Sequence, residues 1–323
     1  MIGSAIKKIA VLTSGGDAPG MNCAIRSVVR FASFKSISVI GVGYGYKGLI
    51  ERDFRILGPR DVSNIISRGG TILKTARSEE FLDRANRERA YNNLIQENIN
   101  ALISIGGNGS FKGLLCLNEE FNFPVVGIPG TIDNDIKATQ RTLGFDTALN
   151  TAMDAIDKIK DTATSMDRIF LIEVMGRDSG SIAVYSALAG GAEDIIIPGA
   201  DIEDDDLVEK IKRGREKGKR SWIVIVAEGA GSVDDFARKF SHAISDIRIT
   251  VIGHTQRGGA PSAFDRLLGA LMGREAVAAL LRGESSSAIG WVNDEAISYS
   301  LKEAVSKKSE NFGYLHELIH ILT

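Results

Sequence analysis

The sequence predicts an α/β protein built from two Rossmann-like, three-layer α/β/α domains with mostly parallel sheets. Short apolar segments alternate with helical segments of ten or more residues, which is the pattern of βαβ units. A chain of 323 residues is long enough for about two such domains. Its 44% hydrophobic and 25% charged residues lie in the ordinary globular range, so each domain can bury a core.

In the first half of the chain, three predicted strands each run into a turn that contains glycine. The strands cover residues 8–13, 100–105 and 123–128, and the turns read SGGD, GGNGS and PGTIDND. A glycine turn between a strand and a helix presents backbone N–H groups to a phosphate. A plain tight turn explains one such loop about equally well, but it explains three of them poorly. We therefore expect three ligand-binding loops at the carboxyl ends of one sheet.

The other predicted elements follow in chain order. A strand over residues 36–45 and helices over 24–32, 61–66 and 84–96 complete the first half. The second half starts after Gly144, with an apolar stripe at helical spacing over residues 146–160. Further strands are predicted over 168–174, 195–198, 221–229 and 247–253, and helices over 182–190 and 204–218.

The PGTIDND segment, residues 129–135, carries the densest group of reactive side chains. It follows a short buried strand, so its carboxylates are expected where open α/β sheets bind ligands. Asp133 and Asp135 are two residues apart and point the same way if the segment is extended. One can hold a metal ion while the other accepts a proton, as phosphoryl transfer requires. For this segment alone, a simple turn between strand and helix has equal weight.

Composition and charge argue against several other classes of protein. A net charge of −2 gives no electrostatic reason to expect binding to nucleic acid or to an anionic membrane. Cys23 and Cys116 are too few for a disulfide framework and favour a reducing cytoplasm. Because the four histidines and two cysteines are scattered through the sequence, we expect no zinc site. Neither a signal peptide nor an apolar stretch long enough to span a membrane is expected.

With these motifs in order, the chain resembles the bacterial-type ATP-dependent 6-phosphofructokinases. The resemblance runs from TSGGDAPGMN at Thr13 to GHTQRGGAPSAFDR at Gly253, and more loosely to the C-terminus. It is specific because PGTIDND, EVMGR (residues 173–177) and HTQRGG occur together in the same order. It implies a cytoplasmic enzyme of glycolysis that transfers a phosphoryl group from ATP to the 1-hydroxyl of fructose 6-phosphate, with Mg²⁺.

The resemblance also implies how the domains are divided. The ATP-binding domain would comprise residues 1–143 and 256–306, and the fructose 6-phosphate-binding domain residues 144–255 and 307–323. The active site is expected in the cleft between them.

Roles in ATP binding and catalysis follow from the matching motif positions. The ATP site is expected to contain Gly15, Tyr46, Arg77, Gly106, Gly107, Asn108, Gly109 and Ser110, with Arg77 reaching toward the transferring phosphate. Asp133 matches the general base for the sugar hydroxyl, and Thr131, Asp135 and Arg177 lie beside it. The resemblance makes Asn108 and Asp133 the expected metal ligands.

Sugar-phosphate recognition is assigned in the same way. The matching positions are Thr131, Asp133, Met175, Gly176, Arg177, Glu228, His254 and Arg257. Arg168 and Arg248 match arginines that these enzymes lend to the sugar site of a neighbouring subunit. Both lie at strand starts, and a strand of six or seven residues spans roughly 20 Å, so neither easily reaches its own subunit's site. The resemblance therefore implies a homo-oligomer, typically a homotetramer.

Basic residues in both halves match an effector site for ADP or phosphoenolpyruvate. The positions are Arg26, Arg30, Arg60, Lys217, Lys219 and Arg220, with Glu193 near the effector's metal. Solvated helix faces and a favourable helix dipole are the alternative explanation. Since all six basic positions are basic here, we expect regulation to be retained.

This chain departs from the family pattern at two positions. Asn108 stands where an Asp normally helps to hold Mg²⁺, and Lys74 stands where small residues are usual. Gly109 and Gly130 favour ATP, because pyrophosphate-dependent relatives typically carry Asp and Lys there.

Asn108 leaves a second hypothesis open, namely a low-activity or non-catalytic paralogue that acts as a nucleotide or sugar-phosphate sensing subunit. A third hypothesis is a kinase of the NAD or lipid type, which shares only a Gly-Gly-Asp-Gly-like motif. The motifs at Arg177 and His254 count against this third hypothesis.

Overall fold

The computed structural model describes residues 6–137, 139–199, 204–244, 246–306, 308 and 312–323. The chain divides into two compact units, the first made of Met1–Thr147 with Arg257–Lys308 and the second of Ala148–Gln256 with Ser309–Thr323. The sequence analysis placed the divisions after residues 143, 255 and 306, and the ligand of each unit remains a prediction. Among the described helices, none is both long enough and apolar enough to cross a membrane.

The first unit is built around a seven-stranded sheet in the order β11-β10-β5-β4-β1-β2-β3. Its strands are β1 (Lys8–Ser14), β2 (Ser38–Val42), β3 (Phe54–Leu57), β4 (Ala101–Gly106), β5 (Val125–Pro129), β10 (Ser286–Val292) and β11 (Glu295–Ser300). The inner strands pair in parallel, whereas β3 and β11 pair antiparallel at the two edges. Because β4 and β5 are buried along their whole length, they appear in the sequence as continuous apolar segments.

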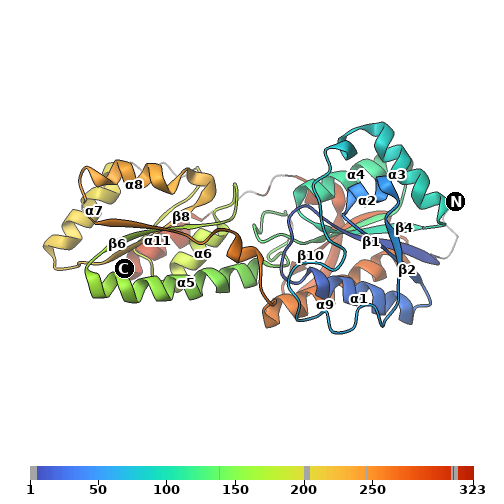
Figure 1. The fold of residues 1–323 in the computed structure, drawn as a ribbon, viewed down its shortest axis with the longest axis horizontal. Helices are drawn as coiled ribbons and strands as arrows, with labels where there is room; N and C mark the ends of the chain where they lie inside the picture. Colours follow the sequence, from blue (N-terminus) through green and yellow to red (C-terminus); the bar gives the residue numbers. More distant parts are fainter. Residues whose placement is uncertain (1–5, 138, 200–203, 245, 307, 309–311) are drawn as a thin grey trace. The chain divides into compact units, whose positions relative to one another are not determined.

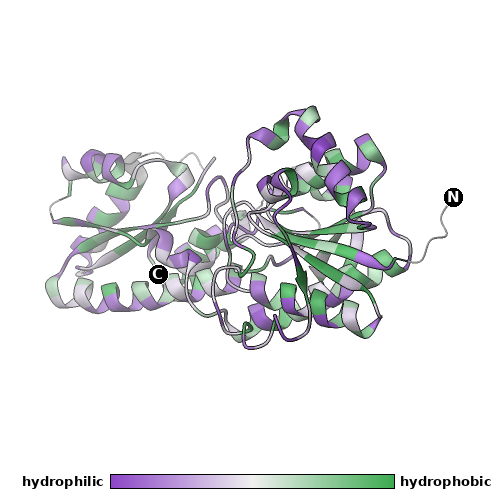
Figure 2. Ribbon diagram, turned by 45° about the vertical axis from the view of Figure 1, so that its right-hand side comes forward, coloured by the Kyte–Doolittle hydropathy of each residue, from purple (hydrophilic) through white to green (hydrophobic). Residues whose placement is uncertain are grey.

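Helices cover both faces of this sheet (Figure 1). They are α1 (Met21–Phe34), α2 (Tyr46–Glu51), α3 (Arg84–Gln96), α4 (Asn108–Phe121), α9 (Ala263–Leu281) and α10 (Leu301–Ala304), with the short 3₁₀ helix η1 (Glu80–Leu82). Helices α1 and α9 lie together on one face, and α2, α3 and α4 lie on the other. Figure 2 shows the strands of the first unit mostly in green, between helices that carry purple residues.

The second unit has a four-stranded, all-parallel sheet in the order β7-β8-β6-β9. Its strands are β6 (Ile169–Val174), β7 (Asp194–Ile196), β8 (Trp222–Ala227) and β9 (Ile247–Val251). Its helices are α5 (Phe145–Met166), α6 (Ser181–Gly190), α7 (Asp204–Glu216), α8 (Val233–Ser241) and α11 (Gly313–Leu322), with η2 (Glu228–Ala230) and η3 (Gly253–Arg257). Helices α7 and α8 lie on one face of the sheet, and α5, α6 and α11 lie on the other (Figure 1).

The structure confirms the mostly parallel α/β prediction and corrects it in places. Each predicted strand is present within a few residues of its expected bounds, but the helix expected over residues 61–66 is absent, because that segment forms turns. Strands β3, β10 and β11 were missed, as were helices α2, α8, α9, α10 and α11. Strand β3 has four residues, of which only Leu57 is buried, so its apolar pattern is too short to be recognised.

Asp265 joins the start of α5 to the start of α9. Its side chain is fully buried and accepts hydrogen bonds from the backbone N–H of Gly144 (2.9 Å) and of Thr147 (2.8 Å). The hydroxyl of Thr147 donates a third bond (2.5 Å), and Ser262 caps α9 by accepting from the N–H of Asp265 (3.2 Å). Burial nevertheless outweighs these bonds and raises the pKa of Asp265 to about 6.

We expect Asp265 to make the stability of the first unit depend on pH. Its folded pKa of about 6 exceeds its ordinary 3.8, so the folded chain binds a proton that the unfolded chain releases between these values. The corresponding contribution, up to about 3 kcal/mol, is present below pH ~4 and is lost as the pH rises through ~6. In calorimetric unfolding, the difference in free energy of unfolding between the wild type and Asp265→Asn should therefore decrease as the pH rises across this range.

The control is Asp154→Asn, which alters an exposed carboxylate on α5 that pairs with Lys158. A stability difference between wild type and Asp265→Asn that is the same at pH 4 and pH 7 would show that Asp265 does not titrate in this window.

Candidate active site

Three loops of the first unit begin side by side because the strands before them are adjacent, parallel and in register. Ser14 at the end of β1 pairs with Gly106 at the end of β4, and Gly106 pairs with Pro129 at the end of β5. The N–H of Gly130 continues this pairing by donating to the carbonyl of Gly106 (3.0 Å). The expectation of three loops at one edge of one sheet is confirmed.

The turn between β4 and α4 needs glycine at its first position. A Cβ on Gly106 would lie 2.3 Å from the hydroxyl oxygen of Ser110 and 2.5 Å from the carbonyl oxygen of Ser14. That close approach lets the Ser110 hydroxyl donate to the Ser14 carbonyl (3.1 Å), which ties the start of α4 to the end of β1.

The start of α4 has the features of an anion site. Gly107 precedes the helix and has no side chain with which to cap it, and a Cβ on Gly109 would meet no atom of the described residues within 4 Å. The open N-terminus of a helix presents N–H groups and a positive dipole end to a phosphate. Asn108, Gly109 and Ser110 are the residues of this first turn.

A short hydrogen bond links this helix start to the loop after β5. The Asn108 amide nitrogen (Nδ2) donates to the Asp135 carboxylate (Oδ2) over 2.6 Å. The contact brings an amide oxygen and a carboxylate into one place from segments 27 residues apart in sequence. Asp135 is thereby held beside the anion-binding end of α4.

The loop after β5 is a turn, which corrects the extended geometry assumed from the sequence. The N–H of Asp133 donates to the hydroxyl of Thr131 (3.2 Å), and Thr142 donates its hydroxyl to the Thr131 carbonyl (2.6 Å). Asn134 has φ 52°, in the left-handed region, so the two-residue alternation of a strand does not apply. Asp133 is only 3% exposed, while Asp135 takes its direction from Asn108.

The loop that carries Arg77 is attached to the end of β1. The hydroxyl of Thr13 donates to the carbonyl of Lys74 (2.8 Å), and the hydroxyl of Thr75 donates to the carbonyl of Gly15 (2.8 Å). Lys74 adopts φ 56° and donates from its ammonium group to the Tyr44 hydroxyl (2.7 Å). Arg77 lies on the surface of this loop.

Tyr46 and Arg257 both contact these loops, in different ways. Tyr46 is buried, stacks on Phe81 at 4.1 Å between ring centroids, and donates its hydroxyl to the Ser110 carbonyl. It therefore supports the first turn of α4 from the core side. The Arg257 guanidinium donates to the Asp17 carbonyl (3.4 Å) and fills the space beside Gly16, where a Cβ would lie 2.6 Å from it.

The second unit repeats the arrangement of aligned strand ends. Val174 of β6 pairs with Ala227 of β8, and Glu173 pairs with Val251 of β9. One carboxylate oxygen of Glu228, directly after β8, accepts from the N–H groups of Gly176 (3.1 Å) and Arg177 (2.8 Å).

Gln256 fixes the same loop from a second side. This residue is fully buried, and its amide oxygen accepts from the N–H of Met175 (2.8 Å). Sequence reasoning included Gln256 only as a letter of HTQRGG, and nothing in the sequence indicates that it is buried. Met175, Gly176, Arg177 and Glu228 are thus held together, and the exposed His254 lies in η3 after the neighbouring strand.

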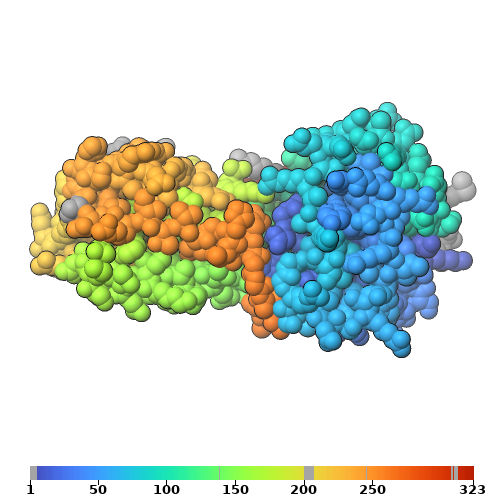
Figure 3. Space-filling view, in the orientation of Figure 1, coloured from blue at the N-terminus to red at the C-terminus, as the bar shows by residue number. Residues whose placement is uncertain are grey.

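Arg168 and Arg248 lie at the other end of the same sheet. Arg168 precedes β6, and Arg248 is the second residue of β9, paired with Phe170. Strand β9 is an edge strand whose exposed surface Figure 3 shows in orange, and Arg248 makes there a 3.8 Å ion pair with Asp246. Within this unit, Arg168 and Arg248 therefore lie away from Arg177. This agrees with the expectation that neither arginine reaches the sugar site of its own subunit.

The residues expected at an effector site fall into two groups. In the first unit, Arg26 and Arg30 lie on α1, and the Arg30 guanidinium donates to the Pro59 carbonyl (3.4 Å), next to Arg60. In the second unit, the Lys219 ammonium lies 3.0 Å from the Glu193 carboxylate. Lys217 and Lys219 line a cavity of about 570 Å³ beyond α7, and the exposed Arg220 follows.

Comparison with known proteins agrees with the motifs. The family model described as Phosphofructokinase matches residues 8–280. The chain is 51% identical to ATP-dependent 6-phosphofructokinase 1 of Thermus thermophilus, over 94% of this chain and 96% of that protein. It is 46% identical to the ATP-dependent 6-phosphofructokinase of Halothermothrix orenii, over 98% of this chain and 100% of that protein.

Solved structures show the same fold. Pichia pastoris phosphofructokinase in the T-state superposes with a TM-score of 0.89 at 37% identity, covering 94% of this chain and 36% of that longer one. A pyrophosphate-dependent phosphofructokinase from Marinobacter aquaeolei, 22% identical over 96% of this chain and 86% of that one, shares the fold with a TM-score of 0.83. The family match, the near-complete coverage of relatives and the aligned loops lead to one conclusion: this chain belongs to the phosphofructokinase family.

Proposed function

We propose that the chain is an ATP-dependent 6-phosphofructokinase, which forms fructose 1,6-bisphosphate and ADP in the cytoplasm as a step of glycolysis. The observation that carries the proposal is the Asn108–Asp135 contact, which places oxygen-bearing side chains beside the open N-terminus of α4. Relatives near 50% identity that carry this activity in their names support it.

The loops after β1 and β4 are assigned to the nucleotide phosphates. The first turn of α4 offers N–H groups and a positive dipole end, and Gly109 leaves the approach open. Arg77, on the loop anchored to Gly15 through Thr75, is assigned to the charge that develops on the transferring group. Positioning and charge neutralisation of this kind supply most of the catalysis in phosphoryl transfer.

Asp133 is assigned the role of general base. The oxygen of the sugar 1-hydroxyl attacks the γ-phosphorus, its proton passes to the Asp133 carboxylate, and the bond to the bridging oxygen of ADP breaks. The Thr131 hydroxyl holds the backbone of Asp133, Thr142 holds that of Thr131, and the Asp133 side chain is buried.

The residues present fit Mg²⁺. Asp133, Asp135 and Asn108 offer carboxylate and amide oxygens, the ligand type that Mg²⁺ prefers. Held by these side chains, Mg²⁺ would supply the positive charge that offsets the charge of the nucleotide phosphates. Asn108 provides a ligand oxygen without negative charge, so we expect a higher Mg²⁺ requirement than an Asp at this position would give.

The loops of the second unit are assigned to the sugar phosphate. Arg177 and His254 supply cationic or hydrogen-bonding groups, and the backbone of Met175 is held by Gln256. Glu228 uses one oxygen to hold the N–H groups of Gly176 and Arg177, which leaves its other oxygen for a sugar hydroxyl. Arg168 and Arg248, at the opposite end of the sheet, serve the site of a second copy in a homotetramer.

Regulation belongs to the same proposal. Arg26, Arg30 and Arg60 in the first unit and Lys217, Lys219 and Arg220 in the second carry positive charge suited to an anionic effector such as ADP or phosphoenolpyruvate. Glu193 pairs with Lys219 and holds the N–H of Ile223 (2.6 Å), so it anchors the strand beside the basic cavity.

Removing the base should abolish most turnover. We expect wild-type protein to convert ATP and fructose 6-phosphate in a coupled assay with Mg²⁺, and Asp133→Asn to lower kcat by about 10²–10⁴-fold with little change in KM for ATP. Asp154→Asn is the matched control on an exposed helix face. Wild-type protein that binds both ligands without turnover would refute the kinase proposal and favour a sensing subunit.

Asn108→Asp tests the metal assignment. It replaces the hydrogen bond to Asp135 by two carboxylates in contact, and unit charges about 4 Å apart repel by roughly 4 kcal/mol at an effective dielectric of 20. The variant should therefore melt lower without Mg²⁺, gain more from added Mg²⁺, and reach half-maximal rate at less Mg²⁺. Asn92→Asp, an exposed change on α3, controls for charge. If Asn108→Asp and wild type depend identically on Mg²⁺, position 108 does not contact the ion.

Arg248→Ala tests the shared sugar site. The half-saturating fructose 6-phosphate concentration should rise at least several-fold, while Arg238→Ala, an exposed arginine on α8 paired with Asp235, should change it little. Mixed oligomers of Arg248→Ala and Asp133→Asn should recover some activity at low fructose 6-phosphate, because some sites then combine intact residues. Proven subunit exchange without recovery would contradict sharing.

A further inference from the structure

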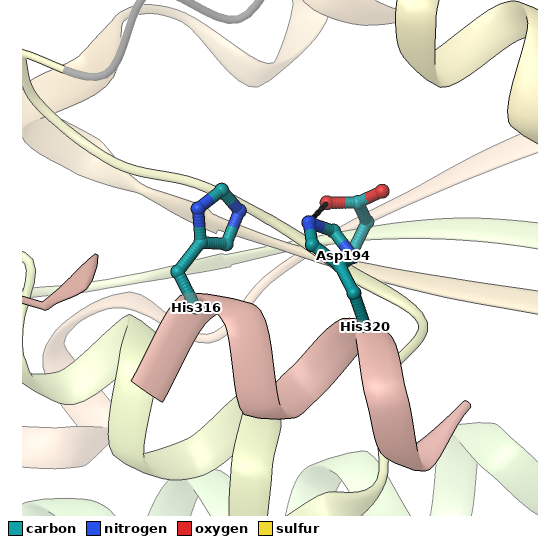
Figure 4. A group of neighbouring side chains, drawn as sticks. All are labelled: Asp194, His316 and His320. Carbon is teal, nitrogen blue, oxygen red and sulfur yellow. Dashed lines mark ion pairs between the residues drawn. The ribbon is translucent and has the colours of Figure 1, made fainter. Parts of the chain in front are cut away.

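The second unit holds a cluster of two histidines and a carboxylate that the proposed reaction does not use. His316 and His320 lie one turn apart on α11, and Asp194 begins β7 beside them (Figure 4). One ligand atom from each of the three lies within 4.8 Å of the others. The Nε2 atom of His320 is 4.0 Å from Asp194 Oδ1, and the two imidazole centroids are 4.6 Å apart.

The cluster already contacts a positively charged side chain, that of Lys210. The Lys210 ammonium lies 2.8 Å from Asp194 Oδ2, 2.5 Å from His320 Nδ1 and 3.0 Å from the Glu193 carbonyl. Asp194 is buried, so its carboxylate needs a positive partner, and the Lys210 ammonium supplies one.

His316 has a ligand atom that is not satisfied by the described residues. Its Nε2 atom is buried and has no hydrogen-bond partner in the described part of the chain. A buried polar atom normally has a partner, so a lone one points to an absent ligand. Two histidines four residues apart on one helix face are a common pair of ligands for a transition metal.

We propose that Asp194, His316 and His320 bind one divalent transition metal ion of the zinc class, with solvent as the remaining ligand. Zinc accepts imidazole nitrogens at about 2.0–2.1 Å and carboxylate oxygens at about 2.0–2.2 Å, so side-chain rotations must draw the three ligand atoms closer together. The metal displaces the Lys210 ammonium from Asp194. Imidazole ligands favour Zn²⁺, Ni²⁺ or Co²⁺ over Mg²⁺, which separates this site from the kinase metal.

The fold explains why the sequence predicted no zinc site. Asp194 lies far from the two histidines in sequence, and only the packing of α11 against the β7 edge brings them together. An ion there would fix the last helix to the sheet. The ion would lie beside Glu193, whose carboxylate pairs with Lys219, and beside the basic cavity that His320 lines. Metal occupancy would therefore be connected to the surface of this cavity.

Calorimetric titration of the full chain with Zn²⁺, in excess Mg²⁺, tests the proposal. We expect one site per chain, with affinity weakened at least about tenfold by His316→Ala and by His320→Ala. His242→Ala, which removes an exposed histidine after α8, should leave the affinity unchanged. Retained kinase activity or unchanged circular dichroism verifies that each variant is folded.

Lys210→Met distinguishes a metal site from a cluster that only stabilises the fold, because only a metal site should gain affinity for Zn²⁺. Removing the competing ammonium should strengthen Zn²⁺ binding by several-fold. Co²⁺ should give a visible absorption band in the wild type that the double variant His316→Ala/His320→Ala lacks. The proposal is overturned if Zn²⁺ does not saturate a site by about 100 µM, if the histidine variants bind as the wild type does, or if Lys210→Met weakens binding.

Discussion

The structure of the first unit depends on the register of three adjacent parallel strands. Ser14, Gly106 and Pro129 end their strands at the same level, so the loops that follow start next to one another. Two hydrogen bonds then join these loops: Gly130 to Gly106 along the backbone, and Asn108 to Asp135 between side chains. A shift of one residue in β4 would separate Asn108 from Asp135 and reverse the faces of the strand.

The second unit also depends on aligned strand ends, but its loop is held by different hydrogen bonds. There the strand ends of β6, β8 and β9 are aligned, and the loop after β6 is fastened by acceptors, Glu228 and Gln256, that bind its N–H groups. Gly176 has φ 143° and Arg177 φ 50°, so the loop adopts an unusual backbone that these acceptors must stabilise. Loops on rigid strand ends position side chains more accurately than free loops do.

Much of this could be predicted from the sequence, because the buried parallel strands are continuous apolar segments and the glycine turns mark where they end. What could not be predicted depends on tertiary contact. The burial of Gln256 and Asp265 and the meeting of Asp194 with His316 each require elements that lie far apart in sequence. Short edge strands such as β3 carry too few buried residues to produce a periodic signal.

Gly109 and Gly130 are the residues that favour ATP over pyrophosphate as the phosphoryl donor. A Cβ on Gly109 would meet no atom within 4 Å in the part of the chain that the structure describes, whereas one on Gly130 would lie 2.9 Å from the Ile105 side chain and 3.1 Å from that of Met21. Position 109 therefore stays free of side chain without any demand from packing, which suits a bulky nucleotide at the start of α4.

The most direct test of ATP as the phosphoryl donor is the initial rate of fructose 6-phosphate phosphorylation with ATP and with pyrophosphate as alternative donors, at saturating Mg²⁺. We expect a kcat/KM for ATP at least about a hundredfold above that for pyrophosphate, a difference of roughly 2.7 kcal/mol in transition-state stabilisation. Equal rates with the two donors, or a preference for pyrophosphate, would contradict it.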